Sequence, residues 1–440
     1  MTTTAHQGQK MSLWMAILAN INVVVGGAFF INAPKISEIA GGLAPIAWMI
    51  CALMLAPLAI IFARLAQRFP HAGSIYVYTK QAFGRFCGFA AGWMYFVGNT
   101  AGNLVLIDAF AQLTFGLLPA TESFAIIRSY GPFYLSLASV ALFTMLSTRG
   151  VAVFKKIQLL VFGIYLVPLI VLFASAALLS DAAHLTSLAV APTWFASCLP
   201  MMIFAYIGIE LGPTMIHVIQ DGAKNITKVI YGTLLLVTLS YVVCQLILIL
   251  CLGPGCGQTG AFACLGWTIG SRFAPWAATL FYYLISSCMG LSFLTGAYAV
   301  FCANNWLLHA MADDLHGFSR KFLLQVNRHQ EPRNCILVQG LIMVALLCFA
   351  HNALWIMHAA TIGVVLAYVI TVFSFIRIFG FKATFAVATL AVCTTFAMAA
   401  ISLRECMADG FVKLLPLFVV LFSFVLIYAL DFFDKQVSDA

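Results

Sequence analysis

Charged residues are scarce in this chain. Asp, Glu, Lys and Arg make up only 8% of its 440 residues, whereas 63% are hydrophobic. A soluble domain has too little interior to bury so much apolar side chain, but a lipid bilayer solvates it. The composition therefore excludes an ordinary soluble protein. It predicts a polytopic membrane protein with one transmembrane domain over residues 1–440.

Motifs for enzymatic chemistry are also missing. The sequence holds no phosphate-binding loop, no zinc-hydrolase motif and no GxSxG, and its 13 cysteines show no CxxC spacing. We therefore expect no catalytic residues, no metal and no cofactor. No cleavable signal peptide is evident, because the first ten residues are polar. Cys256 and Cys264 share one predicted external loop, where either a disulfide or two free thiols would fit.

Long apolar stretches are what the sequence has instead. A spanning helix needs roughly 20 mostly apolar residues. Twelve stretches qualify, at about 12–33, 43–67, 86–117, 131–148, 154–179, 194–219, 229–252, 277–305, 335–350, 354–379, 383–403 and 411–433. The ninth and tenth are separated only by an AHNA turn, so the number of spans is about twelve.

The basic residues predict the orientation. With the N-terminus in the cytoplasm, 17 Lys and Arg fall in inside loops and 5 in outside loops. This asymmetry follows the positive-inside rule. It predicts cytoplasmic tails at 1–11 and 434–440 in a protein of the inner (cytoplasmic) membrane. It also explains the net charge of +8 as topology rather than as nucleic-acid binding.

Two spans are interrupted by helix-breaking residues. The first holds Gly26 and Gly27 at its middle, and the sixth holds Gly208, Gly212 and Pro213. A broken helix is tolerated in the bilayer where it lines a cavity, and paired breaks indicate a substrate site near the midplane. Half-helix N-termini suit a carboxylate, and half-helix C-termini suit an ammonium group. The alternative is that the glycines only allow close helix packing.

Acidic residues inside the spans are candidates for function. Asp108 lies in the third span and Glu210 in the sixth, both well away from the helix ends. An ionisable group in lipid is costly unless it faces a cavity or a partner. The alternative is a protonated carboxyl group that is hydrogen-bonded to neighbouring backbone.

Four segments carry a resemblance to a known family. They are FPHAGSIYVYTKQAFGRFCGFAAGW (69–93), FAYIGIE (204–210), AKNITKVI (223–230) and AMADD…VNRHQEP (310–332). The chain resembles bacterial permeases of the amino acid–polyamine–organocation (APC) superfamily. The resemblance implies the all-α leucine-transporter fold. Two inverted five-helix repeats at 12–179 and 194–379 would be followed by two C-terminal helices at 383–433, with helices 1 and 6 broken at the midplane.

The same resemblance implies where a substrate binds. The substrate carboxylate would bind backbone amides of one segment and its amino group the carbonyls of another, with side chains of helices 3 and 8 around the rest of the substrate. The implied substrate-binding residues are Val25, Gly26, Gly27, Ala28, Asn103, Ala205, Tyr206, Ile207, Gly208 and Tyr298.

The implied function is secondary active transport of an amino acid or polyamine by alternating access, with proton symport or exchange. Proton-coupled members often carry a Lys where this chain has Tyr165, so that coupling group is missing. Glu210 and, after it, His217 are the proton-coupling candidates, since a buried carboxyl or an imidazole titrates in a suitable range. The alternative is a non-transporting nutrient sensor of the same fold. A sensor would be expected to carry a soluble output domain, and the sequence shows none. The sequence does not predict the oligomeric state.

Overall fold

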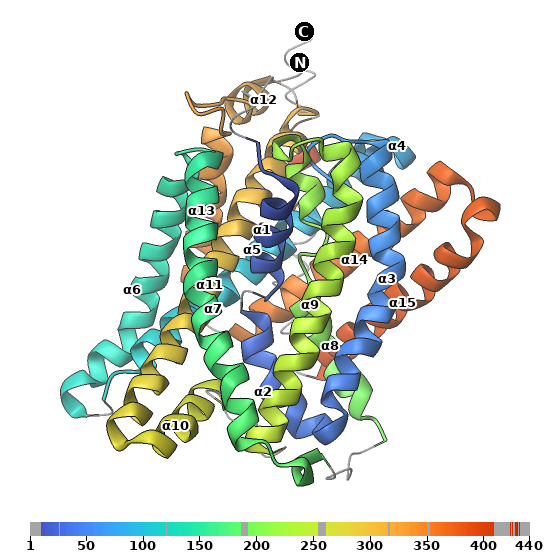
Figure 1. The fold of residues 1–440 in the computed structure, drawn as a ribbon. Helices are drawn as coiled ribbons and strands as arrows, with labels where there is room; N and C mark the ends of the chain where they lie inside the picture. Colours follow the sequence, from blue (N-terminus) through green and yellow to red (C-terminus); the bar gives the residue numbers. More distant parts are fainter. Residues whose placement is uncertain are drawn as a thin grey trace.

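The computed structural model describes most of the chain as helix. The described residues are 10–25, 27–119, 121–185, 192–253, 261–315, 317–349 and 353–408, with 423, 425, 427–429 and 431. Within them there is no β-strand, and one isolated backbone bridge joins Met11 to Ile219. Figure 1 shows the helices packed side by side as a bundle, with α6 and α15 on opposite flanks.

The helices follow one another with short connections. In chain order they are α1 (Leu13–Val25), α2 (Ala28–Ala40), η2 (Gly41–Leu43), α3 (Ala44–Arg68), α4 (Ile75–Phe83), α5 (Arg85–Gly116), α6 (Glu122–Ser147), α7 (Val151–Leu179), η3 (Ala182–Leu185), α8 (Trp194–Tyr206), η4 (Gly212–Val218), α9 (Gly222–Leu252), α10 (Ala261–Phe273), α11 (Pro275–Ala312), α12 (Gly317–Leu323), α13 (Arg333–Phe349), α14 (Ala353–Phe379) and α15 (Phe381–Ala408).

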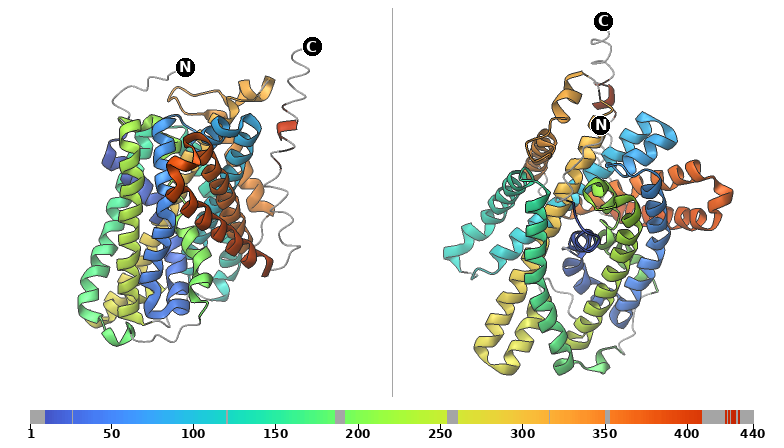
Figure 2. Two further views of the ribbon diagram at one scale, coloured as in Figure 1. Left: turned by 90° about the vertical axis from the view of Figure 1, so that its right-hand side faces the viewer. Right: turned by 45° about the horizontal axis from the view of Figure 1, so that its top comes forward.

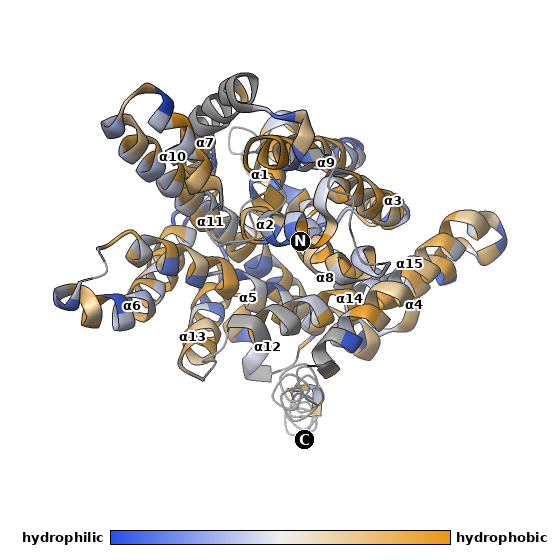
Figure 3. Cartoon of the chain, turned by 90° about the horizontal axis from the view of Figure 1, so that it is seen from below, coloured by the Kyte–Doolittle hydropathy of each residue, from blue (hydrophilic) through white to orange (hydrophobic). Residues whose placement is uncertain are grey.

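The outer surface of the bundle is apolar. Six helical segments of the described residues are long and apolar enough to cross a bilayer, and Figure 3 shows the helices predominantly orange. Leu53, Leu235 and Leu341 each expose 68–70% of their surface. Water would penalise such a surface, whereas lipid covers it. The predicted polytopic all-α class is therefore confirmed. The count of twelve and the inverted repeats stay predictions, because the stretch 411–433 lies mostly outside the described residues.

Both predicted interruptions are present. The first span divides into α1, which ends at Val25, and α2, which begins at Ala28. The sixth divides into α8, which ends at Tyr206, and η4, which begins at Gly212. The right-hand view of Figure 2 shows α1, in dark blue, end-on in the middle of the bundle. Val25, Gly208 and Glu210, which lie beside the two breaks, are buried, so both breaks lie inside the protein rather than against lipid.

Among the described residues, three short α-helices lie outside the predicted spans. They are α4, α10 and α12. In Figure 1, α4 and α12 lie at one end of the bundle and α10 at the other. This placement brings the basic residues of α4 and α12 to the same end, as the charge count predicts. Cys264 is an exposed free thiol on α10, while Cys256 lies outside the described residues.

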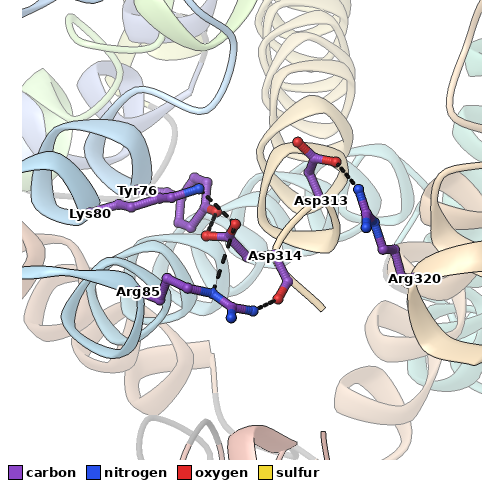
Figure 4. A network of polar contacts seen from close by, with 6 residues as sticks. All are labelled: Tyr76, Lys80, Arg85, Asp313, Asp314 and Arg320. Carbon is purple, nitrogen blue, oxygen red and sulfur yellow. Dashed lines mark hydrogen bonds and ion pairs between the residues drawn. The ribbon is translucent and has the colours of Figure 1, made fainter. Parts of the chain in front are cut away.

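An ionic cluster joins α4 and α5 to the end of α11 (Figure 4). The Lys80 Nζ lies 2.6 Å from the Asp314 Oδ1, and the Arg85 Nε lies 3.9 Å from the same oxygen. The Tyr76 hydroxyl donates to the other carboxylate oxygen, and the Arg85 guanidinium donates to the Asp314 backbone carbonyl. Charged hydrogen bonds of this kind are stronger than neutral ones. The cluster therefore links three helices at this end of the bundle.

Candidate functional site

A cavity lies where the two broken spans meet α5. The broken spans contribute Val23, Val24, Ala28, Phe204, Ile207 and Leu211. Helix α5 contributes Gly98, Asn99, Gly102, Asn103 and Leu106, while α11 and α14 contribute Val300 and Ala360. We call this the central cavity. Residues far apart in the sequence form it, because both helix interruptions fall at the same place in the bundle.

Gly208 allows the sixth span to unwind. Its φ of +114° lies in a region that residues with a Cβ rarely adopt, and an added Cβ would lie 2.6 Å from Val23 Cγ1. Only glycine meets both conditions. Beyond it, Pro213 supplies no N–H donor, and the remainder of the span forms the 3₁₀ helix η4 rather than an α-helix. The local backbone structure therefore explains why Gly208 and Pro213 occur in this span.

Unwinding frees backbone carbonyls, and two side chains satisfy some of them. The Asn20 amide on α1 donates to the Ile209 carbonyl at 3.1 Å. The Tyr241 hydroxyl on α9 lies 2.7 Å from the Val24 carbonyl and 2.8 Å from the Ala205 carbonyl. The Val24 and Ala205 carbonyls belong to the last turns of α1 and α8. A hydroxyl has one hydrogen, so Tyr241 donates to one of them at a time.

The N-terminus of α2 has a geometry that suits an anion. In the described part of the chain no side chain caps this helix. The first N–H groups of a helix have no partner within it, and the helix dipole makes that end positive. Ala28, the first residue of α2, lines the central cavity. A carboxylate in the cavity would meet free N–H donors there.

Two asparagines of α5 face the central cavity with unused hydrogen-bonding atoms. Asn103 is 1% exposed, and neither its Oδ1 nor its Nδ2 has a partner among the described residues. Asn99 is 3% exposed, and its Oδ1 is likewise unpaired. Buried amides almost always have partners. A ligand or water in the cavity would supply them.

Glu210 points away from the central cavity. Its side chain is fully buried and accepts hydrogen bonds from the Tyr95 hydroxyl at 2.8 Å and the Gly208 N–H at 3.1 Å. The Tyr368 hydroxyl bonds to it as well. The carboxyl group therefore holds the unwound segment against α5 and α14. Asp108, by contrast, is half-buried on α5 and does not line the cavity.

Tyr298 lies at a second, smaller cavity, and His217 packs on one of the residues that line it. Tyr298 lines it together with Asn305, Trp306 and Glu331. His217 is half-buried with its ring 4.2 Å from the Trp306 ring, and both of its nitrogens are buried without partners among the described residues. Trp306 therefore contacts His217 and lines the same cavity as Tyr298, whereas Glu210 bonds to Tyr95 and Tyr368.

Glu331, which the sequence analysis did not single out, is the carboxyl group of this second cavity. It lies in the connection between α12 and α13 and is 8% exposed. Burial raises its pKa to about 8, and a hydrogen bond from Trp306 opposes that rise. No sequence pattern indicated its burial, because a glutamate in a polar loop is ordinarily solvated.

The remaining predicted residues lie around the central cavity in different ways. Ala28, Asn103 and Ile207 line it. The others belong to the broken segments without lining it: Val25, Gly27, Ala205, Tyr206 and Gly208. Gly26 and the side chain of Tyr165 lie outside what the structure describes.

Several cavity residues were not predicted. The four-residue spacing of Asn99 and Asn103 puts both on one helix face, and this signal was available in the sequence. The sequence held no such signal for Val300 and Ala360, because apolar residues of a spanning helix look alike in sequence. Among the described residues, no three His, Cys, Asp or Glu side chains converge in a way that would hold a metal ion.

Comparison with known proteins adds a family and several relatives. A family model described as "Amino acid permease" matches residues 11–439. The chain is 25% identical over 107 residues to a glutamate/serine transporter of Bacillus subtilis, covering 24% of this chain and 20% of the relative. It is 32% identical over 101 residues to an arginine/ornithine antiporter of Pseudomonas aeruginosa, covering 22% and 21%.

A longer alignment joins the chain to an uncharacterized transporter of Legionella pneumophila. The two are 24% identical over 309 residues, which cover 66% of this chain and 63% of the relative. The alignments therefore span between a fifth and less than two thirds of the lengths of these relatives.

Proposed function

Because this chain belongs to the amino acid permease family, we propose that it is a secondary active transporter that moves an amino acid across the inner membrane by alternating access. The observation that carries the proposal is the meeting of two broken helices at one cavity. A zwitterionic α-amino acid needs a donor site and an acceptor site a few ångströms apart. Broken helices supply both from backbone alone. The termini would lie in the cytoplasm.

The substrate carboxylate would bind the N–H groups at Gly26, Gly27 and Ala28. Its amino group would bind carbonyls between Ala205 and Ile207, at the end of α8. The carbonyl of Ala205 already faces the Tyr241 hydroxyl. An arriving ammonium group would therefore compete with Tyr241, and substrate binding would alter how the end of α8 is held.

Glu210 would couple transport to protons. As a carboxylate it accepts from Tyr95, Tyr368 and the Gly208 N–H. Protonation turns one oxygen into a donor. The tyrosine hydroxyls can rotate in response, but the Gly208 N–H is fixed by the backbone. Protonation would therefore weaken the contact to the unwound segment and shift the balance between inward-open and outward-open states.

Uptake by the purified protein in liposomes tests the transport proposal. The panel is the twenty amino acids and common polyamines, each with and without an imposed proton gradient. We expect concentrative uptake of at least one amino acid when the gradient is present. No uptake of any member under either condition would refute transport and favour a sensor.

The pH profile of Glu210→Gln tests the coupling residue. We expect uptake by this variant to lose its dependence on the proton gradient while substrate exchange persists. His217→Ala is the comparison variant. A wild-type profile in Glu210→Gln would assign that carboxyl a structural role, and a flat profile in His217→Ala alone would move the coupling to His217.

A further inference from the structure

The central cavity holds no charge that would accept a cationic or anionic side chain. Among the described residues that line it, none is Asp, Glu, Lys, Arg or His. The two carboxyl groups of neighbouring spans are used elsewhere or point elsewhere. Glu210 is bound by two tyrosines and a backbone N–H, and Asp108 lies off the cavity. A charged substrate side chain that entered the cavity would lose its hydration without gaining a counter-charge, which is strongly unfavourable.

The cavity does hold unused neutral hydrogen-bonding atoms. Asn103 offers one acceptor and two donors, and Asn99 offers an acceptor one helical turn away. Both side chains are almost completely buried. A substrate group that donates and accepts at the same time would satisfy them. Hydroxyl and carboxamide groups do this, whereas an alkyl side chain would leave the amides unpaired.

The central cavity is also narrow next to α5. A Cβ added at Gly102 would lie 3.6 Å from the Ala360 Cβ and 3.8 Å from the Phe204 ring, which is ordinary contact. The apolar residues Leu106 and Val300 border the same space. The space between α5 and α14 at this level is thus about one methyl group wide. A long side chain would not fit there without movement of the helices.

We propose that the central cavity selects a neutral α-amino acid whose short side chain carries a hydroxyl or carboxamide group, which Asn99 and Asn103 bind. This inference rests on the proposed transport function and assigns its substrate class. Selectivity comes from two terms: absence of a counter-charge rejects basic and acidic side chains, and the buried amides reject alkyl ones. A site built to hydrogen-bond a polar group discriminates strongly against analogues that lack it.

Competition for uptake in proteoliposomes tests the substrate class. The labelled substrate is serine, and the competitors are threonine, asparagine, glutamine, alanine, valine, arginine, glutamate and putrescine. We expect serine, threonine or asparagine to be preferred at least tenfold over alanine, which matches serine without its hydroxyl. Arginine, glutamate and putrescine should not compete. Equal competition by arginine or putrescine would overturn the proposed class while leaving transport intact.

Variants then assign the class to the named residues. Asn103→Ala should reduce the preference for serine over alanine about tenfold while alanine uptake persists. Asn103→Asp, of nearly the same shape, should admit basic substrates. An unchanged serine-to-alanine ratio in Asn103→Ala would overturn the role of this residue. If either variant fails to fold, the selectivity of the wild-type protein still decides the substrate class.

Gly102→Ala tests the size limit. We expect it to lower the relative uptake of threonine and asparagine more than that of serine. Gly116→Ala on the same helix is the matched control, because its added Cβ meets nothing within 4 Å. Equal effects of the two substitutions would refute a steric limit at Gly102. Failure of wild-type protein to take up any amino acid would instead refute the transport proposal, and this inference with it.

Discussion

Single residues fix the backbone around the central cavity, and Gly208 does so most directly. We expect Gly208→Ala to reduce uptake at least tenfold. A positive φ costs a non-glycine residue about 1–2 kcal/mol, and the new methyl group would also overlap Val23. The measurement is initial uptake rate alongside thermal stability in detergent. Gly163→Ala is the control, because its Cβ would meet nothing within 4 Å. Wild-type uptake by Gly208→Ala would show that unwinding at this residue is dispensable.

Glu331 predicts a pH dependence of stability. Its pKa is raised from 4.5 to about 8 in the folded protein. The stabilisation relative to the unfolded chain is therefore complete below pH 4.5 and is lost as pH rises through about 8. We expect Glu331→Gln to remove this loss, so that the variant is more stable than wild type at pH 9 but not at pH 4.5. One pKa unit corresponds to about 1.4 kcal/mol, so the gain is at most about 5 kcal/mol.

The measurement for Glu331 is apparent Tm at pH 4.5, 7 and 9. Glu122→Gln is the control, because Glu122 is exposed at the start of α6. If the Glu331→Gln and wild-type curves stay parallel across this range, Glu331 is not a buried titrating group.

At the scale of elements, α9 holds the two broken helices together. The Tyr241 hydroxyl reaches carbonyls at the ends of both α1 and α8, and its ring stacks on Phe29 of α2 at 4.5 Å. Tyr241→Phe keeps the ring and removes the hydroxyl. We expect it to lower the free energy of unfolding by about 1–3 kcal/mol, because a buried carbonyl loses its donor.

Thermal unfolding in detergent measures this loss, and binding measured in parallel shows whether the freed carbonyls alter substrate affinity. Tyr231→Phe is the control on the same helix, because Tyr231 is 40% exposed. A Tyr241→Phe variant as stable as the Tyr231→Phe variant would mean that the hydroxyl does not support the two helix ends.

At the scale of the whole molecule, the Asp314 cluster joins helices from distant parts of the chain. Asp314→Asn keeps the shape of the side chain and removes its charge. We expect it to destabilise the protein by about 1 kcal/mol, with a smaller difference at high salt. Lys80 and Arg85 are about a third exposed or more, so solvent screens both pairs.

Asp313→Asn provides the neighbouring control. Asp313 pairs with Arg320 at 3.0 Å, but both side chains are more than half exposed. We expect it to change stability by less than about 0.5 kcal/mol. Apparent Tm at low and high salt measures both variants. A larger loss in Asp313→Asn than in Asp314→Asn would show that the cluster does not join α4 to α11.

Backbone hydrogen bonds also join the segment before α1 to the sixth span. The Met11 N–H donates to the Val218 carbonyl at 2.7 Å, and the Gln220 N–H donates to the Met11 carbonyl at 2.8 Å. These bonds join the entry to α1 with the end of η4. The start of the first span and the end of the sixth span are therefore connected to each other.

Sequence alone predicts the polytopic class, the breaks in two spans and the gathering of the basic residues of α4 and α12 at one end of the bundle. These follow from local properties: apolar length, the φ freedom of Gly208, the missing N–H of Pro213 and the placement of Lys and Arg. Ala28, Asn103 and Ile207, which the family resemblance implied as substrate-binding residues, line the central cavity, and their binding of a substrate stays a prediction.

The direction in which the polar groups of the broken helix point depends on packing between distant segments. Glu210 and His217 are seven residues apart and would share one face of a continuous helix. The unwound turn between them destroys that register, so Glu210 meets Tyr95 and Tyr368 while His217 packs on Trp306. Long-range packing, not sequence spacing, likewise brings Glu331 out of water and places Ala360 beside Gly98 and Gly102 of α5.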